Sequence, residues 1–280
     1  MDTKDLLEYS IKRLFPEIAQ NNNKYLEFFT KIVESQINLI VEWQRVGFIH
    51  GVMNTDNMSI SGETIDYGPC AFMDEYNPNK VFSSIDNNGR YAFNNQPRIA
   101  LWNLARFAET IIHLIDKNQE FAIKKVENIL KFYENKYYEL WLSMMRNKIQ
   151  INNINANDEE LIKELLDLMH VFKLDYTNTF VDIENNDIEK YDFMKKWFTK
   201  LKERRKLNHN NKVLKKSNNP KMIPRNHLVE KILNESEKEN YTTLDKLLVN
   251  ISNPYNENIS DEFKQAPKEE EKIHQTFCGT

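Results

Sequence analysis

Three oxygen-bearing side chains, those of Asp56, Asn57 and Asp66, lie within residues 47–68, which also hold four of the chain's six glycines. Carboxylate and amide oxygens are the ligands that hard divalent cations take in proteins, and glycine permits sharp turns close to a ligand. Apolar and polar residues alternate around a glycine over residues 58–65, which predicts a short β-hairpin. The two acids would then face one metal from opposite ends of the hairpin. Asp and Asn are equally typical of plain turns, so the spacing alone leaves that alternative open.

The elements that must position this cluster are mostly helices. Apolar residues recur at helical spacing from Leu26 to Trp43, which predicts a helix that ends near Gly47 and leads directly into the cluster. Pro97 begins a second periodic segment that continues to Ile115. Further helices are expected over residues 119–148, 157–172, 187–206 and 226–250. The expected fold class is mainly α, with a small β-hairpin that carries the polar cluster.

Composition divides the chain near its C-terminal end. Residues 207–225 are rich in Asn and Lys and contain two prolines, which predicts an exposed linker. We therefore expect a main domain over residues 1–206, with its metal and catalytic loop at 47–70. A C-terminal helical extension and tail would occupy residues 226–280.

Bulk properties exclude several classes of protein. Hydrophobic residues make up 40% of the 280 residues and charged residues 29%, which is enough for a packed core. A net charge of −4 provides no general attraction for nucleic acid or an anionic membrane. No apolar run approaches the roughly 20 residues of a membrane span, and the N-terminus lacks a signal-peptide pattern. We expect a cytoplasmic protein with neither nucleic acid nor membrane as a partner.

The polar cluster has the spacing of a kinase catalytic loop with one important change. His50 and Asn57 fit the motif H-x-D-x-x-x-x-N, and Asp66-Tyr67-Gly68 corresponds to the metal-binding triplet D-F-G. Val52 occupies the position of the usual catalytic Asp and cannot accept a proton. The nearest acid is instead Asp56, beside the metal-binding Asn. This pattern disfavours ordinary phosphoryl transfer, and His50 is expected to brace the loop.

The altered loop closely resembles that of the selenoprotein O family of protein adenylyltransferases. The resemblance rests on segments spread over nearly the whole chain. They are His50-Gly51-Val52-Met53-Asn54-Thr55-Asp56-Asn57-Met58-Ser59, Thr64-Ile65-Asp66-Tyr67-Gly68-Pro69, Asn95-Gln96-Pro97 with Trp102-Asn103-Leu104, Asp175-Tyr176-Thr177-Asn178-Thr179-Phe180, Pro224-Arg225-Asn226 and Thr276-Phe277-Cys278-Gly279-Thr280.

This resemblance implies a protein-kinase-like (pseudokinase) fold, of which the chain would be the C-terminal lobe. Members bind ATP in a flipped pose and transfer AMP to Ser, Thr or Tyr hydroxyls of proteins, and transfer of UMP is also ascribed to some. By position, Asp56 would be the general base, and Asn57 and Asp66 would bind Mg²⁺ or Mn²⁺. Asp66 would also contact the phosphates of ATP, the co-substrate, through the metal.

The residues with which family members bind the nucleotide are expected in an N-terminal half. Members carry there a glycine-rich loop, a Lys that contacts ATP, its Glu partner and phosphate-binding Arg residues. No such pattern appears in this sequence, which has no glycine before Gly47. We therefore expect a separate N-terminal lobe as a partner. The alternative is a non-catalytic fragment or a regulatory binding module.

Two further features leave alternatives open. Cys70 follows Asp66 closely, and Cys278 lies in the family's redox-type tail, which suggests a Cys70–Cys278 disulfide under oxidation as an alternative to two reduced thiols. Arg90 and Arg98 flank a family-like segment and can contact phosphate or a protein substrate, although a surface ion pair is the commoner arrangement.

Overall fold

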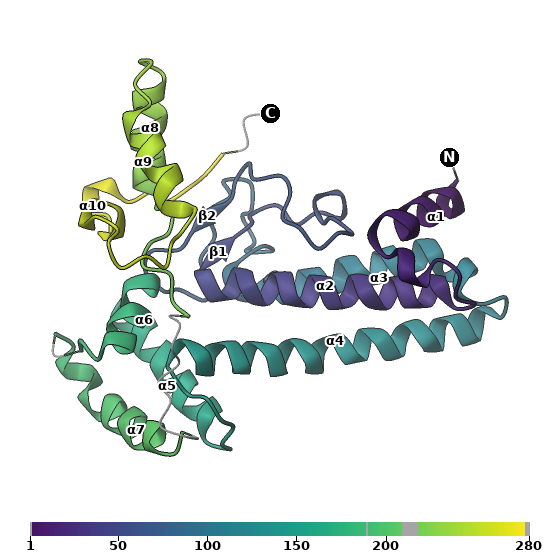
Figure 1. Ribbon diagram of the computed structural model, residues 1–280, viewed down its shortest axis with the longest axis horizontal. Coiled ribbons are helices and arrows are strands. Elements are labelled where there is room, and N and C mark those ends of the chain that lie inside the picture. Colours follow the sequence, from purple (N-terminus) through teal and green to yellow (C-terminus); the bar gives the residue numbers. More distant parts are fainter. Residues whose placement is uncertain (1, 189, 209–217, 278–280) are drawn as a thin grey trace.

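The fold is mainly helical, as expected, with one very small sheet (Figure 1). The computed structural model describes residues 2–188, 190–208 and 218–277. Its helices are α1 (Thr3–Leu14), α2 (Lys24–Val46), α3 (Gln96–Ile115), α4 (Gln119–Lys148), α5 (Asp158–Val171), α6 (Tyr176–Asn185), α7 (Lys195–Lys206), α8 (Asn226–Ser236), α9 (Thr242–Ile251) and α10 (Asp261–Lys264). The strands are β1 (Phe48–Ile49) and β2 (Ala71–Phe72). Among the described residues, no helix combines the length and the low polarity needed to cross a lipid bilayer.

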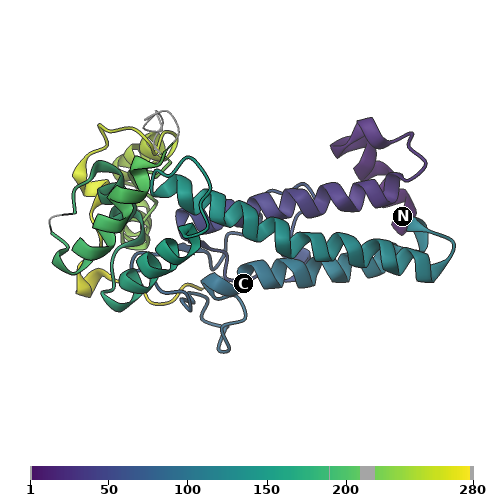
Figure 2. The same cartoon turned by 90° about the horizontal axis from the view of Figure 1, so that it is seen from below.

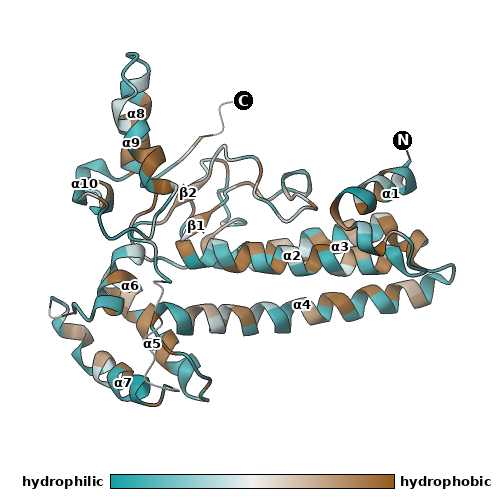
Figure 3. Ribbon diagram, in the orientation of Figure 1, coloured by the Kyte–Doolittle hydropathy of each residue, from teal (hydrophilic) through white to brown (hydrophobic). Residues whose placement is uncertain are grey.

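Three long helices, α2, α3 and α4, form the framework of the main core. They run alongside one another toward one end of the molecule, while α5 to α10 gather at the other end (Figure 2). Hydrophobic and hydrophilic residues alternate along each of them, as expected for helices with one buried face (Figure 3). The expected helices over residues 26–43, 97–115, 119–148 and 157–172 are therefore confirmed as α2 to α5.

Helix α2 ends at Gly47, as expected, and this end sets the direction of the functional loop. Gly47 has φ +73°, and its N–H donates to the carbonyl groups of Trp43 and Gln44. A Cβ at Gly47 would lie 3.0 Å from the ring of Tyr176, so the residue meets both a conformational and a steric requirement for glycine. The chain then enters β1.

The sheet differs from the expected hairpin over residues 58–65. Strands β1 and β2 pair antiparallel, with Phe48 opposite Phe72 and Ile49 opposite Ala71. Within the expected hairpin only a single bridge forms, between Met58 and Thr64. The residues between them form the turn, so this single bridge replaces the longer pair of strands that was predicted. The sheet instead closes the ends of the whole loop, through contact of the Phe48 and Phe72 rings at 5.3 Å.

Two predicted helices have different limits. The helix expected over residues 187–206 begins only at Lys195, after a short 3₁₀ turn over Asp192–Met194, and α6 precedes it. The helix expected over residues 226–250 is divided into α8 and α9. Glu239 lies between them with φ +62°, a left-handed conformation that interrupts a helix.

The buried side chains form two clusters. The larger extends from Leu7 to Leu201, and the smaller from Met222 to Phe263 on and around α8 to α10. The exposed linker expected over 207–225 is not found at residues 219–223, which are buried. This part of the segment packs into the protein because it carries apolar Met222 and Ile223 into the interior.

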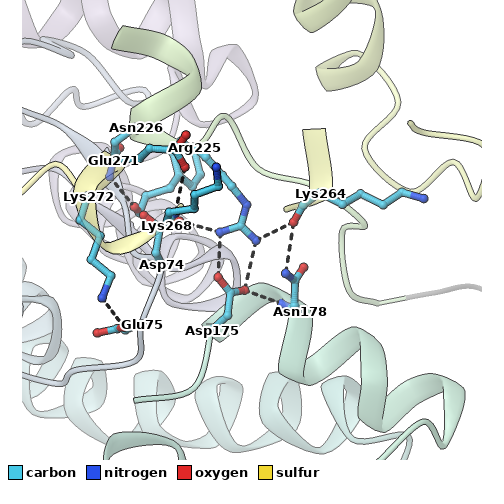
Figure 4. A network of polar contacts seen from close by, with 11 residues as sticks. Asp74, Glu75, Asp175, Asn178, Arg225, Asn226, Lys264, Lys268, Glu271 and Lys272 are labelled. Carbon is cyan, nitrogen blue, oxygen red and sulfur yellow. Dashed lines mark hydrogen bonds and ion pairs between the residues drawn. The ribbon is translucent and has the colours of Figure 1, made fainter. Parts of the chain in front are cut away.

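Arg225 joins the C-terminal elements to the rest of the fold (Figure 4). Its side chain is fully buried, and its Nη1 lies 2.5 Å from a carboxylate oxygen of Asp74 and 2.7 Å from one of Asp175. Its Nη2 donates to the carbonyl oxygen of Lys264 at 3.0 Å. Asp175 also accepts the N–H of Asn178 and so caps α6. Since Asp74 follows β2 by two residues, this network holds the C-terminal extension against the chain that leaves the functional loop.

Candidate functional site

The loop that follows β1 is anchored by the first residue of α3. The backbone N–H of His50 donates to Oε1 of Gln96 at 2.9 Å, and Nε2 of Gln96 donates to the carbonyl oxygen of Phe48 at 3.0 Å. The buried amide of Gln96 thus provides hydrogen-bond partners for two backbone groups that would otherwise have none. Helix α3 thereby fixes the point at which the loop begins.

His50 braces the loop, as expected. Its ring is buried, Nδ1 lies 3.3 Å from the backbone nitrogen of Val52, and Nε2 lies 2.8 Å from the carbonyl oxygen of Ile65. An N–H of Val52 needs an acceptor and a carbonyl needs a donor, so the proton belongs on Nε2 of a neutral ring. Burial lowers the pKa of His50, which keeps the ring neutral. The brace therefore joins the loop at residue 50 to the segment just before Asp66.

The residues just before Asp56 are held by side chains from other segments of the chain. The hydroxyl of Tyr91 donates to Oδ1 of Asn54 at 2.6 Å, and Nδ2 of Asn103 donates to the carbonyl oxygen of Met53 at 2.9 Å. Sequence reasoning matched Gln96 and Asn103 to the family but gave them no role, and it did not single out Tyr91. Their partners are about 40 to 50 residues away along the chain, so only the structure shows what they do.

The amide of Asn57 has a fixed orientation. Its Nδ2 donates to the carbonyl oxygen of Val52 at 3.1 Å, so the side-chain oxygen lies on the other side of the amide group and remains available. Asn57 precedes the bridge residue Met58, and Asp66 follows the bridge residue Thr64. Because the bridge is antiparallel, these two predicted ligands lie at the same end of it.

The carboxylates of Asp56 and Asp66 are exposed to solvent. In the part of the chain that the structure describes, neither one accepts a hydrogen bond or forms an ion pair. Asp66 has φ +55°, a conformation that Asp and Asn tolerate better than other residues with a side chain. The carboxylates therefore remain free to accept a proton or to bind a cation.

The donor set fits a hard divalent cation only in part. Two carboxylates and one amide oxygen match the ligands of Mg²⁺ and Mn²⁺, which commonly keep water and substrate phosphates as their other ligands. No group of three or more His, Cys, Asp and Glu side chains suited to a metal occurs among the described residues. A metal at this site would consequently depend on a phosphate-bearing ligand to complete its coordination.

The C-terminal segment also reaches the loop. The N–H of Thr276 donates to the carbonyl oxygen of Phe82 at 2.8 Å, and its hydroxyl donates to the carbonyl oxygen of Pro69. Burial raises the pKa of the neighbouring Cys70 thiol to about 11, so its reactive thiolate form is disfavoured. Cys278 lies outside the described residues, and the Cys70–Cys278 disulfide remains a prediction.

Comparison with known proteins shows the family of this chain. The family described as "Protein adenylyltransferase SelO" matches residues 1–252, and the chain belongs to this family. It is similar to proteins named "Protein nucleotidyltransferase YdiU". These include one from Clostridium perfringens strain 13, 45% identical over 289 residues, one from Bacillus cytotoxicus, 44% identical over 290, and one from Pelagibacter ubique, 46% identical over 290. Each comparison covers 100% of this chain but only 59–60% of the relative, so the chain spans about three-fifths of their length.

Proposed function

We propose that this chain carries the catalytic loop of a protein adenylyltransferase that moves AMP from ATP to Ser, Thr or Tyr hydroxyls of proteins. The observation that carries the proposal is the pair of exposed, unpaired carboxylates, Asp56 and Asp66, on a loop braced by buried His50. The names of the relatives support nucleotide transfer to protein. We further propose that the helical fold is the C-terminal lobe of a kinase-like pseudokinase.

In this proposal Asp56 is the general base. It takes the proton of the acceptor hydroxyl as the hydroxyl oxygen forms a bond to the α-phosphorus of ATP. The bond between the α-phosphorus and the bridging oxygen breaks, and pyrophosphate leaves. Val52 cannot replace Asp56, because its side chain is apolar and buried.

Asn57 and Asp66 would hold Mg²⁺ or Mn²⁺, which neutralises charge on the phosphates. The hydrogen bond from Asn57 to Val52 and the positive φ of Asp66 orient these ligands before any substrate binds. The sequence lacks the glycine-rich phosphate loop of the family. We therefore propose that an N-terminal lobe outside these 280 residues completes the nucleotide site.

The test is a transfer assay with ATP labelled at the α-phosphate, a divalent metal and a cell extract. With the N-terminal lobe added, we expect labelled protein with the parent chain and none with Asp56→Asn or Asp66→Asn. Asp245→Asn, which removes an exposed carboxylate from α9, should behave as the parent does. Labelling of protein by ATP labelled at the γ-phosphate, but not by ATP labelled at the α-phosphate, would contradict the proposal. Absence of transfer even with an added N-terminal lobe would favour the alternative, a non-catalytic binding module.

A further inference from the structure

An exposed cluster of one Trp and two Arg side chains lies beside the candidate site. The guanidinium carbon of Arg90 is 4.9 Å from the ring centroid of Trp102, and that of Arg106 is 5.4 Å from it. Trp102 is 43% exposed, although an aromatic ring of this size is usually largely buried. We call these three residues the Arg–Trp–Arg cluster.

The cluster is attached to the catalytic loop through the residues next to its members. Tyr91, adjacent to Arg90, donates a hydrogen bond to Asn54, and Asn103, adjacent to Trp102, donates one to Met53. These contacts lie two and three residues before Asp56. A second bond from Asn103, to the sulfur of Met58, holds the loop on the other side of Asp56. The position of the cluster relative to the proposed base is therefore fixed by side chains.

Arg106 approaches the loop more directly. It lines a cavity of about 250 Å³ that is also lined by Thr55, the residue before Asp56, and by Met58. Ile32 and Gln36 of α2 line the same cavity. An acceptor polypeptide that placed a hydroxyl at Asp56 would thus pass close to the Arg–Trp–Arg cluster.

The positive charge of this surface is only partly compensated. A surface ion pair was the commoner arrangement expected for Arg90 and Arg98 from the sequence. In the described part of the chain, neither of them forms one. Arg106 pairs only with Glu109, at 2.7 Å, and both of these side chains are largely exposed. The nearby carboxylate of Asp86 accepts the backbone N–H groups of Arg90 and Tyr91 and forms no ion pair in the described part of the chain.

We propose that the Arg–Trp–Arg cluster binds acidic side chains of the acceptor protein next to the hydroxyl that receives the nucleotide. A guanidinium group binds a carboxylate through two parallel hydrogen bonds, and the indole ring keeps each guanidinium in place by a cation–π contact. The chemical class of substrate is thus a Ser, Thr or Tyr flanked by Asp or Glu. This inference rests on the proposed function, whose acceptor site it describes.

The test measures binding separately from catalysis. A dye-labelled peptide with one Tyr flanked by Glu, and the same peptide with Gln in place of Glu, are titrated with the parent chain without ATP. We expect the Glu peptide to bind more tightly and to lose affinity as salt is added, because exposed charge pairs are screened. Arg90→Gln and Arg106→Gln should each weaken binding of the Glu peptide about fivefold and leave the affinity for the Gln peptide unchanged.

A variant with the same change of charge provides the control. Lys196→Gln removes a positive charge from an exposed position on α7 and should leave both affinities unchanged. Arg90→Lys keeps the charge but lacks the two-pronged geometry, so it should bind the Glu peptide with intermediate affinity. Circular dichroism of each variant verifies that the helices are intact.

The possible results distinguish failure of the acidic acceptor site from failure of the proposed nucleotide transfer. Equal affinity for the two peptides, or an unchanged affinity in Arg90→Gln, would overturn the acidic acceptor site even if transfer occurs. A weaker affinity of Arg90→Gln for ATP, measured by calorimetry, with unchanged peptide binding would assign the cluster to the nucleotide and also overturn it. Charge-dependent peptide binding by a chain that transfers no nucleotide even with the N-terminal lobe added would support the cluster and count against the proposed function.

Discussion

Gly51 lies so close to Pro69 that a Cβ on Gly51 would be 2.8 Å from the carbonyl oxygen of Pro69. Gly51 also has φ +85°, which residues with a side chain rarely adopt. The contact joins the loop after His50 to the segment after Asp66. The segments before and after the predicted ligands therefore pack closely against each other at Gly51 and Pro69.

Substitution of Gly51 should disturb this contact strongly. We expect Gly51→Ala to lower the free energy of unfolding by about 3 kcal/mol, through the left-handed backbone and the clash together. Gly89→Ala provides the control, since Gly89 has φ +66° but a Cβ there would meet nothing closer than 3.8 Å. Its cost should be about 1 kcal/mol, from the backbone alone. Urea denaturation measures both values, and equal costs would contradict the steric role of Pro69.

The buried His50 should make stability sensitive to acid. Because burial lowers its pKa below the ordinary 6.5, the unfolded chain binds a proton at a pH where the folded chain does not. The free energy of unfolding should therefore fall as pH decreases below about 6.5, as the unfolded imidazole becomes charged. His50→Gln should show a shallower decline, whereas His113→Gln, at an exposed position, should follow the parent. Identical pH profiles of His50→Gln and the parent would contradict this assignment.

The backbone of Asp66 allows its charge to be tested apart from its conformation. Asp66→Asn should preserve stability, because Asn tolerates the φ of +55°, and should abolish binding of Mn²⁺ in the presence of ATP. Asp66→Ala should lose the same binding and also about 1 kcal/mol of stability from backbone strain. Calorimetry measures the binding of Mn²⁺, and thermal denaturation measures the stability of each variant. Undiminished Mn²⁺ binding by Asp66→Asn would remove Asp66 from the set of ligands.

Loss of Arg225 should leave two partly buried acids, Asp74 and Asp175, without their partner. We expect Arg225→Met to lower the free energy of unfolding by about 3–5 kcal/mol at neutral pH. Burial already raises the pKa of Asp74, and removal of the cation should raise it further. Protonation then relieves the repulsion between Asp74 and Asp175, so the deficit relative to the parent should shrink as pH falls.

Lys206→Met is the control for Arg225, because the ion pair of Lys206 with Glu203 is on the surface and contributes little. Urea denaturation at neutral and acidic pH gives the comparison. A deficit for Arg225→Met that does not change with pH would show that the acids do not determine it.

Local periodicity was sufficient to predict the long helices but not the sheet. The apolar spacing of α2 and the proline at the start of α3 are signals within one segment of chain. The pairing of β1 with β2 involves strands of two residues each, which have no periodicity to detect. The division between α8 and α9 depends on the left-handed Glu239, for which the sequence offers no glycine as a signal.

The candidate site shows the same limit. Asp56, Asn57 and Asp66 were found because their types and spacing are local, and their catalytic and metal-binding roles stay predictions. The residues that hold the loop were found only in part, because Tyr91 and Asn103 contact it across about 40 to 50 positions. The partners of Arg225 are 151 and 50 residues away, and no pattern in the sequence connects them.

The contact of Thr276 with Pro69 has a consequence for how the protein is made. A ribosome synthesises residues 47–70 early, whereas Arg225 and Thr276, which secure the chain just after that loop, emerge late. The loop is thus synthesised before two of the residues that hold it in place. A message cut short before the codon for Thr276 would yield the predicted ligands without the segment that holds them in place.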